Sequence, residues 1–411
     1  MKNNLYKITI CLIGLILSVS SLYYFYLFYE KNSFLPAPFL MDRYDTFMDF
    51  YNVNWWANRG DFYSMWRGFY SPLNIYIANL INDPLCVNSI TSIRYRICNP
   101  DLYYPFGIIC TAISFTALLI YSRKNLISII LVLIFSVSMP YLFAIERGNY
   151  IILCFMILCI SMLINNALIY TIIYAILVNI KFYIFLPSLL TFYNIRYSVL
   201  FIFLSTFLLI FFSYFIVDPQ WYLIPYNILN FSGYIPSSLN MLWNATTFSH
   251  VDMLFSQLGF NVFLVSYIKL AVIFFKSYII FRFYLFIKNS YKNNIEQLNI
   301  FYVTILFMLT FSSSLNYYSI ILIYPYFLYL NNKHRLSNTS ITTIVMLCIP
   351  NIYTLLEPTW IYKTYTPDNS VYGWHLTIIS QDLSVTSITT PILIFALFLQ
   401  LTQSKNYETI K

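Results

Sequence analysis

Three aspartates follow the first apolar stretch of the chain, and their spacing suits acid–base chemistry. Asp42, Asp45 and Asp49 fall at positions i, i+3 and i+7, which puts them on one face if this stretch is helical. A carboxylate held close to a substrate hydroxyl can act as a general base. We therefore expect the catalytic group among these three, with Asp49 as first candidate, although a solvated surface helix would explain the same stripe.

Aromatic side chains follow the acidic stripe closely. Trp55, Trp56 and Trp66 come next in the chain, and Tyr70 lies just beyond them. Rings with polar tips form platforms for sugars, or they anchor a loop at a membrane interface. We expect Trp55 and Tyr70 to contact substrate.

Two basic residues and an amide are candidate anion-binding groups. Arg147 and Asn149 belong to the motif Glu146-Arg147-Gly148-Asn149 between two apolar stretches, where capping of helix ends would also explain them. Lys181 lies inside an apolar stretch, where a charge costs about 3 kcal/mol on insertion scales. A lysine that faces a water-filled cavity is suited to hold an anion.

The composition excludes a soluble globular protein. Hydrophobic residues make up 60% of the chain and charged residues 9%, against about one quarter charged residues in soluble domains. The net charge of +8 is not gathered into a basic stripe, so we expect no nucleic-acid partner. The expected partner is a lipid bilayer, and the fold class is an all-α, polytopic bundle of transmembrane helices.

About twelve spans fit the apolar stretches. An even number of spans puts both termini on the same side, which the positive-inside rule makes the cytoplasmic one. The stretch 167–193 is read as two short segments that meet near Lys181, because one span there would invert every later loop. The expected spans are 8–29, 103–122, 125–145, 150–165, 167–180, 181–193, 196–217, 258–286, 298–311, 316–331, 340–356 and 384–402.

Basic residues support this topology. The segment 218–268 contains no Lys or Arg and is therefore placed outside. We treat 1–411 as a single integral membrane domain whose large outer loop, 30–103, carries the candidate catalytic aspartate. The residues expected on the inner side are Lys2, Lys7, Arg123, Lys124, Arg196, Arg282, Lys288, Lys292, Lys333, Arg335, Lys405 and Lys411.

Two of the seven cysteines, Cys86 and Cys98, lie in the large outer loop, and the other five lie in apolar stretches. A disulfide between them would stabilise the loop by about 3 kcal/mol in an oxidising compartment. Two free thiols are the alternative. The three histidines are scattered and no Gly-rich phosphate loop occurs, so we expect no cofactor, although the acidic stripe could hold a divalent metal.

The loop motifs resemble those of a known superfamily of membrane enzymes. In that superfamily the loop carries, in order, an aspartate, aromatic residues, a glycine, a tyrosine and a Tyr-x-Pro motif. The same order occurs here in Asp49-Phe50-Tyr51, Gly60-Asp61-Phe62-Tyr63 and Tyr70-Ser71-Pro72. Gly148-Asn149 matches part of a Gly-Gln-x-Asn turn of the superfamily. Its Lys-x-x-Pro motif corresponds to Lys181 and Pro187, with wider spacing. Its Trp-Asp-His-Tyr motif corresponds to Leu315-Asn316-Tyr317-Tyr318, which lacks the histidine. The chain thus resembles the polytopic C-type (GT-C) glycosyltransferases, in their polyprenyl-phosphate-sugar-dependent alpha-mannosyltransferase-like branch, and its composition is similar to that of O-antigen-modifying glucosyltransferases.

The resemblance implies an inverting hexosyltransferase of the bacterial inner membrane with a periplasmic active site. The donor would be a polyprenyl-phosphate-linked sugar, and the acceptor a glycan or lipid-linked glycan of a surface polysaccharide such as lipopolysaccharide O-antigen. Asp49 would be the base, or else Asp45 or Asp42. The donor phosphate or the sugar would be bound by Arg147, Lys181, Asn149, Tyr70, Trp55 and Asn316. A repeat-unit polymerase and a polysaccharide flippase or secondary transporter are the alternatives.

Overall fold

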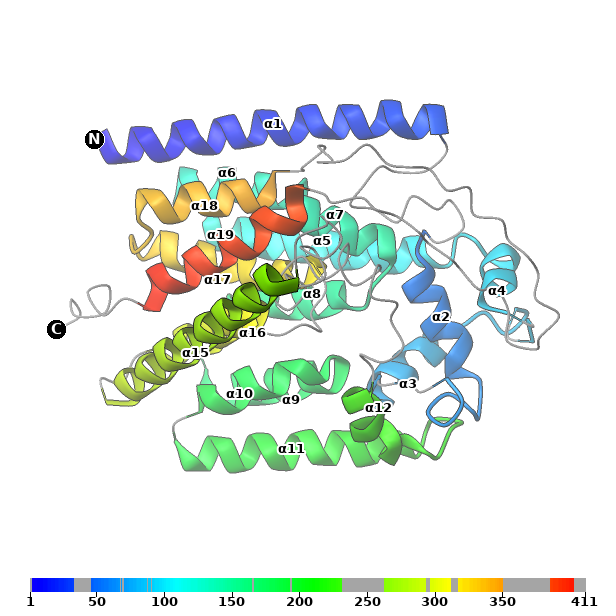
Figure 1. Ribbon diagram of the computed structural model, residues 1–411. Coiled ribbons are helices and arrows are strands. Elements are labelled where there is room, and N and C mark those ends of the chain that lie inside the picture. Colours follow the sequence, from blue (N-terminus) through cyan, green and yellow to red (C-terminus); the bar gives the residue numbers. More distant parts are fainter. Residues whose placement is uncertain are drawn as a thin grey trace.

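Helices make up the fold, and no strand occurs among the described residues (Figure 1). The computed structural model describes residues 2–32, 46–66, 68, 70–86, 88–89, 91–164, 166–192, 194–230, 262–292, 296–311, 317–349 and 385–402. The α-helices are α1 (Lys2–Asn32), α2 (Met48–Ala57), α3 (Pro72–Ile81), α4 (Ser92–Cys98), α5 (Tyr103–Ser122), α6 (Leu126–Ser136), α7 (Met139–Arg147), α8 (Ile151–Ser161), α9 (Ala167–Ile180), α10 (Phe185–Thr191), α11 (Ile195–Ser213), α12 (Ile224–Asn230), α15 (Val262–Lys292), α16 (Gln297–Phe311), α17 (Tyr324–Asn332), α18 (Asn338–Cys348) and α19 (Val385–Thr402). Short 3₁₀ turns add η1 (Phe182–Ile184), η2 (Trp221–Leu223) and η5 (Tyr317–Ile323).

Among the described residues, four helical segments are long and apolar enough to cross a membrane. They are Asn4–Lys31, Tyr103–Ser122, Leu126–Arg147 and Ile195–Ser213. Seven further apolar helices in the described part of the chain, of 10–17 residues, are shorter than the roughly 20 residues that a 30 Å hydrocarbon layer requires. The helix α15 is long enough, at 31 residues, but it is not among the four segments that are also apolar enough. A polytopic helical membrane protein is therefore supported, and the number of twelve spans stays a prediction.

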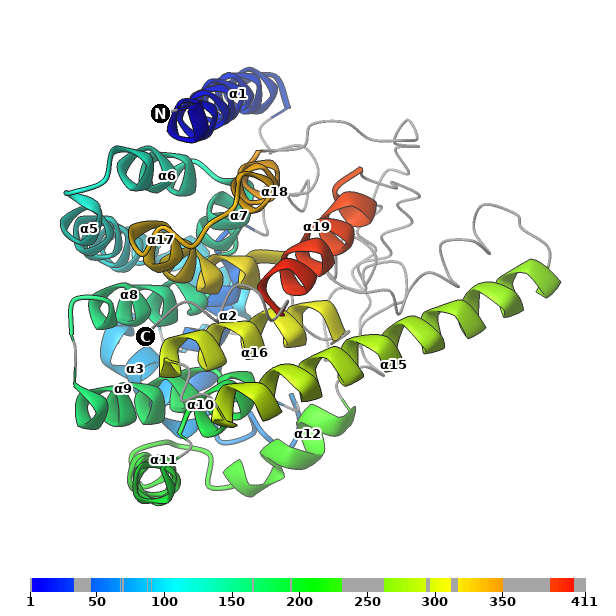
Figure 2. The same ribbon diagram turned by 90° about the vertical axis from the view of Figure 1, so that its left-hand side faces the viewer.

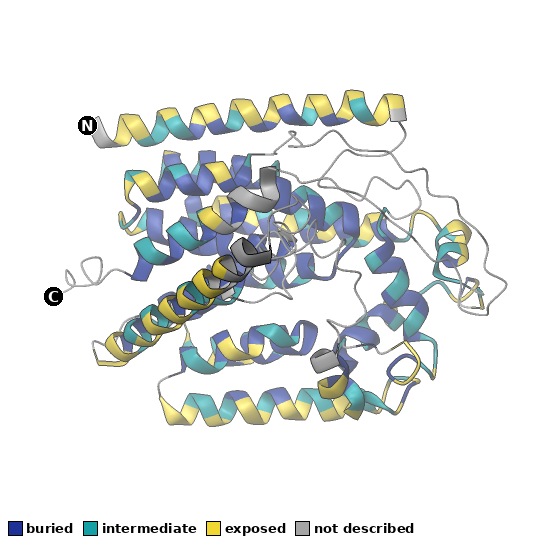
Figure 3. Cartoon of the chain, in the orientation of Figure 1, coloured by how far each residue is buried: buried dark blue, intermediate teal, exposed yellow. Residues whose placement is uncertain are grey.

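The outermost helices carry the apolar surface that lipid would cover. The helices α1 and α11 lie on opposite sides of the bundle, and their outward faces are exposed (Figures 2 and 3). Ile16 of α1 and Phe203 of α11 are each more than 60% exposed. In water such surface would be costly, whereas lipid tails solvate it without penalty.

One end of the bundle gathers the basic turns. Lys7 at the start of α1 donates to the Leu336 carbonyl before α18 at 2.7 Å, and Arg335 pairs with Glu296 before α16 at 3.1 Å. The start of α1, the α5–α6 turn and the end of α15 lie toward this same end (Figure 1). This clustering is the arrangement that the positive-inside rule requires, while the identity of the compartment stays a prediction.

Asparagine caps begin three of the helices. The Asn125 side chain accepts from the backbone N–H groups of Ile127 and Ser128, and Asn166 and Asn194 cap α9 and α11 in the same way. Asparagine is among the best N-cap residues because its oxygen satisfies N–H groups that lack an intrahelical partner. These caps set where the apolar stretches enter the bundle.

The expected span 125–145 is divided in the structure. The helix α6 ends at Ser136, and α7 begins at Met139 after the buried Ser138, which accepts from the Tyr324 hydroxyl at 2.9 Å. Pro140 has no N–H for the Ser136 carbonyl and its ring opposes a continuous helix, which explains the break. The shorter α7 can therefore end within the bundle, at the turn that carries Arg147.

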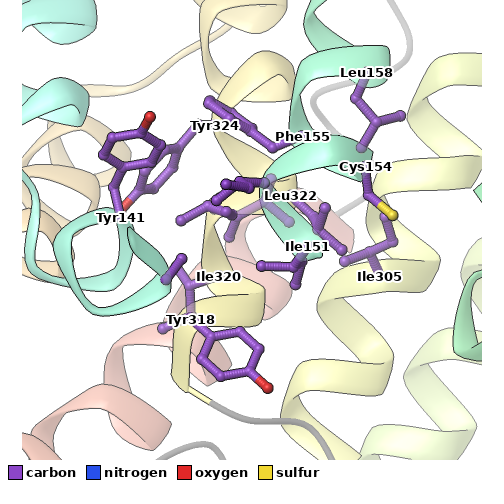
Figure 4. Close-up of a cluster of buried hydrophobic side chains, with 14 of the residues drawn as sticks. Tyr141, Ile151, Cys154, Phe155, Leu158, Ile305, Tyr318, Ile320, Leu322 and Tyr324 are labelled. Carbon is purple, nitrogen blue, oxygen red and sulfur yellow. The ribbon is translucent and has the colours of Figure 1, made fainter. Parts of the chain in front are cut away.

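A cluster of apolar side chains beneath this turn forms part of the core. Figure 4 shows residues of α7, α8, α16, η5 and α17 in contact, among them Phe155 and Leu322, both 0% exposed. Tyr318 lies at the edge of the cluster, and its hydroxyl points away from it. The cluster thus fixes the base of the site, and Tyr318 reaches out of it.

Candidate functional site

Asp49 occupies the first turn of α2, where a carboxylate is favoured by the positive end of the helix. The residue before the helix, Phe47, has a φ of 62° and lies in the left-handed region. Its backbone N–H donates to the Glu146 carbonyl at 2.7 Å. This bond between two distant segments brings Asp49 against the α7–α8 turn.

The α7–α8 turn supplies two partners for Asp49. Gly148 ends α7 in the left-handed conformation, with a φ of 64°. Arg147 forms an ion pair with Asp49 Oδ1, and Asn149 Nδ2 donates to Asp49 Oδ2 at 2.7 Å. Each carboxylate oxygen has two acceptor positions, so one bond at each leaves capacity for a substrate hydroxyl. The Asp49 side chain is 21% exposed.

The orientation of the Asn149 amide is fixed by its other bonds. Its oxygen accepts from the Ile151 backbone N–H at 3.0 Å at the start of α8, so its nitrogen must face Asp49. The same nitrogen donates to the Tyr318 hydroxyl at 3.0 Å. Asn149 therefore joins α2, α8 and η5 at one point.

Lys181 lies where the chain turns between α9 and η1. Its backbone is extended, with a φ of −138° and a ψ of 103°, so the predicted interruption near Lys181 is confirmed. The side chain is only 9% exposed, and its Nζ lies 4.8 Å from the centre of the Tyr70 ring. An ammonium over an aromatic face is stabilised by the ring quadrupole. Asp49 is close enough to Lys181 to interact with it electrostatically.

Tyr70 completes the cluster from the outer loop. Burial raises the pKa of its phenol well above 10, and the nearby Asp49 carboxylate raises it further. The phenol therefore keeps its proton at neutral pH. The formal charges of the cluster are one negative, on Asp49, and two positive, on Arg147 and Lys181. The net positive charge suits a bound monoanion.

The other candidates lie elsewhere or outside the described residues. Trp55 is 5% exposed, and its indole N–H donates to the Ser89 carbonyl at 2.8 Å. The Arg59 guanidinium lies 4.7 Å from the Trp55 ring centre, so this ring is packed inside the loop. Asp42, Asp45 and Asn316 lie outside the described residues. Within the described part of the chain, no group of three or more His, Cys, Asp or Glu side chains could hold a metal ion.

The disulfide that the sequence left open is present. Cys86 and Cys98 are bonded, with their Cα atoms 5.8 Å apart. The bridge closes the segment that leads into α4, where the Asp83 carboxylate accepts from Asn99 Nδ2 at 2.6 Å. Tyr51 of α2 donates to the Pro100 carbonyl at 2.6 Å, which ties this segment to the helix that bears Asp49.

Sequence reasoning missed the contribution of Tyr318. Tyr318 is the last residue of the motif Leu315-Asn316-Tyr317-Tyr318, in which the sequence points to Asn316 as the binding residue. The signal that could have identified Tyr318 is a phenol at the start of an otherwise apolar stretch, where its hydroxyl requires a polar partner.

No family model matches this chain, and no similar curated protein or solved structure was found.

Proposed function

We propose that this chain is a membrane-embedded inverting glycosyltransferase of the bacterial inner membrane. It moves a hexose from a polyprenyl-phosphate donor onto a glycan or lipid-linked acceptor at the periplasmic face. Surface polysaccharide such as O-antigen is the acceptor class. The proposal combines the family resemblance of the loop motifs with the geometry of the site.

The observation that carries the proposal is the convergence on Asp49 of groups from three other parts of the chain, namely the α7–α8 turn, the α9–η1 turn and the segment around Tyr70. Arg147 and Asn149 bond its two oxygens, and Lys181 lies under Tyr70 close by. These parts of the chain lie far apart in the sequence, and their charged side chains are costly to bury. A partly exposed carboxylate beside two cations supports transfer of a sugar from a phosphate, because it combines a base for the acceptor hydroxyl with positive charge for the leaving group.

The transfer step uses these residues in separate roles. Asp49 takes the proton of the acceptor hydroxyl as its oxygen attacks the anomeric carbon of the sugar. The bond from that carbon to the phosphate oxygen breaks, and the electron pair leaves with the phosphate. Lys181 and Arg147 stabilise the added negative charge. A phosphate leaving group needs no general acid, so one carboxylate suffices, unlike the pair that glycoside hydrolysis uses.

The attack inverts the configuration at the anomeric carbon because no covalent sugar–enzyme intermediate is formed. Asn149 keeps Asp49 in place through its amide nitrogen. This nitrogen faces the carboxylate because the amide oxygen accepts from the Ile151 N–H. Asp49 is a catalytic residue in this scheme, and Asn149 is a positioning residue.

Reconstituted full-length protein tests the proposal. Radiolabelled polyprenyl-phosphate mannose and polyprenyl-phosphate glucose are supplied in separate proteoliposome reactions with the glycolipid fraction of bacterial membranes. Label should move from one donor into that fraction, and released sugars should have inverted anomeric configuration. Movement of intact donor across the bilayer without transfer would instead support a flippase, and lengthening of unlabelled repeat units without donor use would support a polymerase.

A further inference from the structure

Two buried polar side chains tie the outer loop to the chain beyond α11. Asp218 is 3% exposed, and its carboxylate accepts from the backbone N–H groups of Tyr63 at 2.6 Å and Gln220 at 2.9 Å. Asn227 of α12 is also 3% exposed, and its amide nitrogen donates to the carbonyls of Tyr63 at 2.9 Å and Gly68 at 2.8 Å. We call this pair the Asp218–Asn227 clasp.

The clasp is linked to Lys181 through two tyrosines. The Tyr63 hydroxyl donates to the Tyr70 carbonyl at 3.0 Å, which holds the backbone beneath the Tyr70 ring. That ring lies over Lys181 Nζ at 4.8 Å. A continuous series of contacts therefore runs from Asp218, through Tyr63 and Tyr70, to the candidate phosphate-binding lysine.

The loop segment around Tyr63 depends on these side-chain bonds. Residues 58–66 form turns between α2 and α3 rather than a helix, so few of their backbone groups are bonded within a regular element. Buried backbone groups need partners, and the clasp satisfies one N–H and two carbonyls. Loss of the clasp would release Tyr70 from its place over Lys181.

We propose that Asp218 and Asn227 are positioning residues that hold Tyr70 over Lys181 and so set how Lys181 meets the phosphate of the donor. The kind of ligand rests on the proposed glycosyltransferase function, whereas the clasp can be tested without it. Neither residue touches the reacting atoms; both act through Tyr63 and Tyr70.

Two substitutions remove the clasp in different ways. Asp218→Asn replaces one acceptor oxygen by an NH₂ group, which must then face a backbone N–H of Tyr63 or Gln220. Asn227→Ala removes both bonds to the loop carbonyls. Asp83→Asn is the matched control, since Asp83 also accepts a backbone N–H, that of Leu85 at 2.9 Å, but just before the disulfide-closed segment 86–98 and away from Tyr63.

The readout is acylation of Lys181 by acetic anhydride in the detergent-solubilised full-length protein, measured by peptide mass spectrometry. Exposed Lys288 and Lys333 serve as internal references. Maleimide labelling of buried Cys348, which lies in α18, reports any general unfolding. Asp218→Asn and Asn227→Ala should each raise Lys181 acylation about 5- to 10-fold, with Cys348 still protected.

Transfer kinetics give the second readout. Both variants should raise the KM for the polyprenyl-phosphate sugar while the KM for the acceptor stays unchanged, whereas a purely structural defect would lower the active fraction alone. Unchanged Lys181 acylation in both variants, or an equal rise in Asp83→Asn, would overturn the clasp. Absence of transfer by the wild-type chain would instead overturn the proposed function, and Lys181 acylation would still decide the clasp.

Discussion

Phe47 and Gly148 pass each other with both backbones in the left-handed region, at φ values of 62° and 64°. A Cβ added at Gly148 would lie 3.0 Å from Phe47 Cα and 2.9 Å from Phe50 Cβ. Only a glycine permits this approach, and the approach lets the Phe47 N–H reach the Glu146 carbonyl. The crossing of these two segments places Asp49 beside Arg147 and Asn149.

Gly148→Ala should separate the two segments. A left-handed alanine and its contact with the Phe47 backbone together should cost about 1–3 kcal/mol, so the thermal midpoint should fall. Transfer should fall further than the folded fraction does, because Asp49 moves away from Arg147. Gly60→Ala is the control, since the nearest atom to its added Cβ is Val217 Cγ1 at 3.9 Å. Equal effects of the two substitutions would show that the crossing is unimportant.

The sequence predicts the individual residues of the site, but not the crossing of the Phe47 and Gly148 segments that brings them together. Residue type and apolar patterning identify Asp49, Arg147 and Lys181 one at a time, because a charge inside or beside an apolar stretch needs a reason. The interruption at Lys181 follows from the same reasoning and is confirmed by the end of α9 at Ile180. Nothing local to these residues predicts that they meet, because the left-handed φ of Phe47 is atypical for a bulky residue.

The structural roles of Trp55 and Asp218 could not be predicted from the sequence. An aromatic ring in a loop is equally consistent with a sugar platform and with packing. The contacts of Trp55 with Ser89 and Arg59 come from the fold and could not be predicted from the residue type. Asp218 appeared in the sequence only as the start of a segment without Lys or Arg. One of its two bonds is accepted from the backbone N–H of Tyr63, 155 residues away in the sequence, and backbone groups leave no residue-type signal.

Asn149→Asp should place a second carboxylate against Asp49. The bond from the Ile151 N–H at the start of α8 should survive, since a carboxylate oxygen accepts it as well as an amide oxygen does. The two carboxylates repel each other, and Asp49 Oδ2 loses the N–H donor that holds it, so Asp49 should turn away from the acceptor hydroxyl. Transfer should fall about 100-fold at pH 7.

Asn166→Asp is the matched control for this substitution. Asn166 also accepts from the backbone N–H two residues later, that of Leu168 at 2.9 Å, at the start of α9, and it is exposed. Transfer by this variant should match the wild type. Similar losses in both variants would assign the effect to the caps rather than to Asp49.

Reduction of the Cys86–Cys98 bond should loosen the outer loop. The bridge spans a sequence separation of 12, for which the chain-entropy model gives about 3 kcal/mol. Cys86→Ser should therefore lower the thermal midpoint and render Cys98 reactive to maleimide, while the five buried thiols remain protected. Labelling of both loop cysteines in unreduced wild-type protein would contradict the bridge.

Tyr51 should make the outer loop sensitive to alkaline pH. Burial raises the pKa of Tyr51 from its ordinary value of about 10 to about 12, so the folded state holds the proton more tightly than the unfolded chain does. The stability it contributes is complete below pH 10 and is lost as the pH rises from about 10 toward 12, at up to about 1.4 kcal/mol per pH unit.

Thermal midpoints measured between pH 9 and pH 11 test this dependence. Tyr51→Phe should give a shallower decline with pH than the wild type, although its midpoint starts lower because the bond to the Pro100 carbonyl is lost. Tyr104→Phe, at a position that is 48% exposed, should decline as the wild type does. Parallel declines in all three proteins would rule out Tyr51 as the titrating group.

The most direct test of the account compares Asp49→Asn with Asp61→Asn in the hexose-transfer assay. Both carboxylates belong to the outer loop and both pair with an arginine, Asp61 with Arg59 at 3.0 Å. If Asp49 is the base, Asp49→Asn should lower transfer by about 10²- to 10⁴-fold, and Asp61→Asn should leave it within about twofold. Retention of near-normal transfer by Asp49→Asn, with the protein folded in the membrane, would contradict the account.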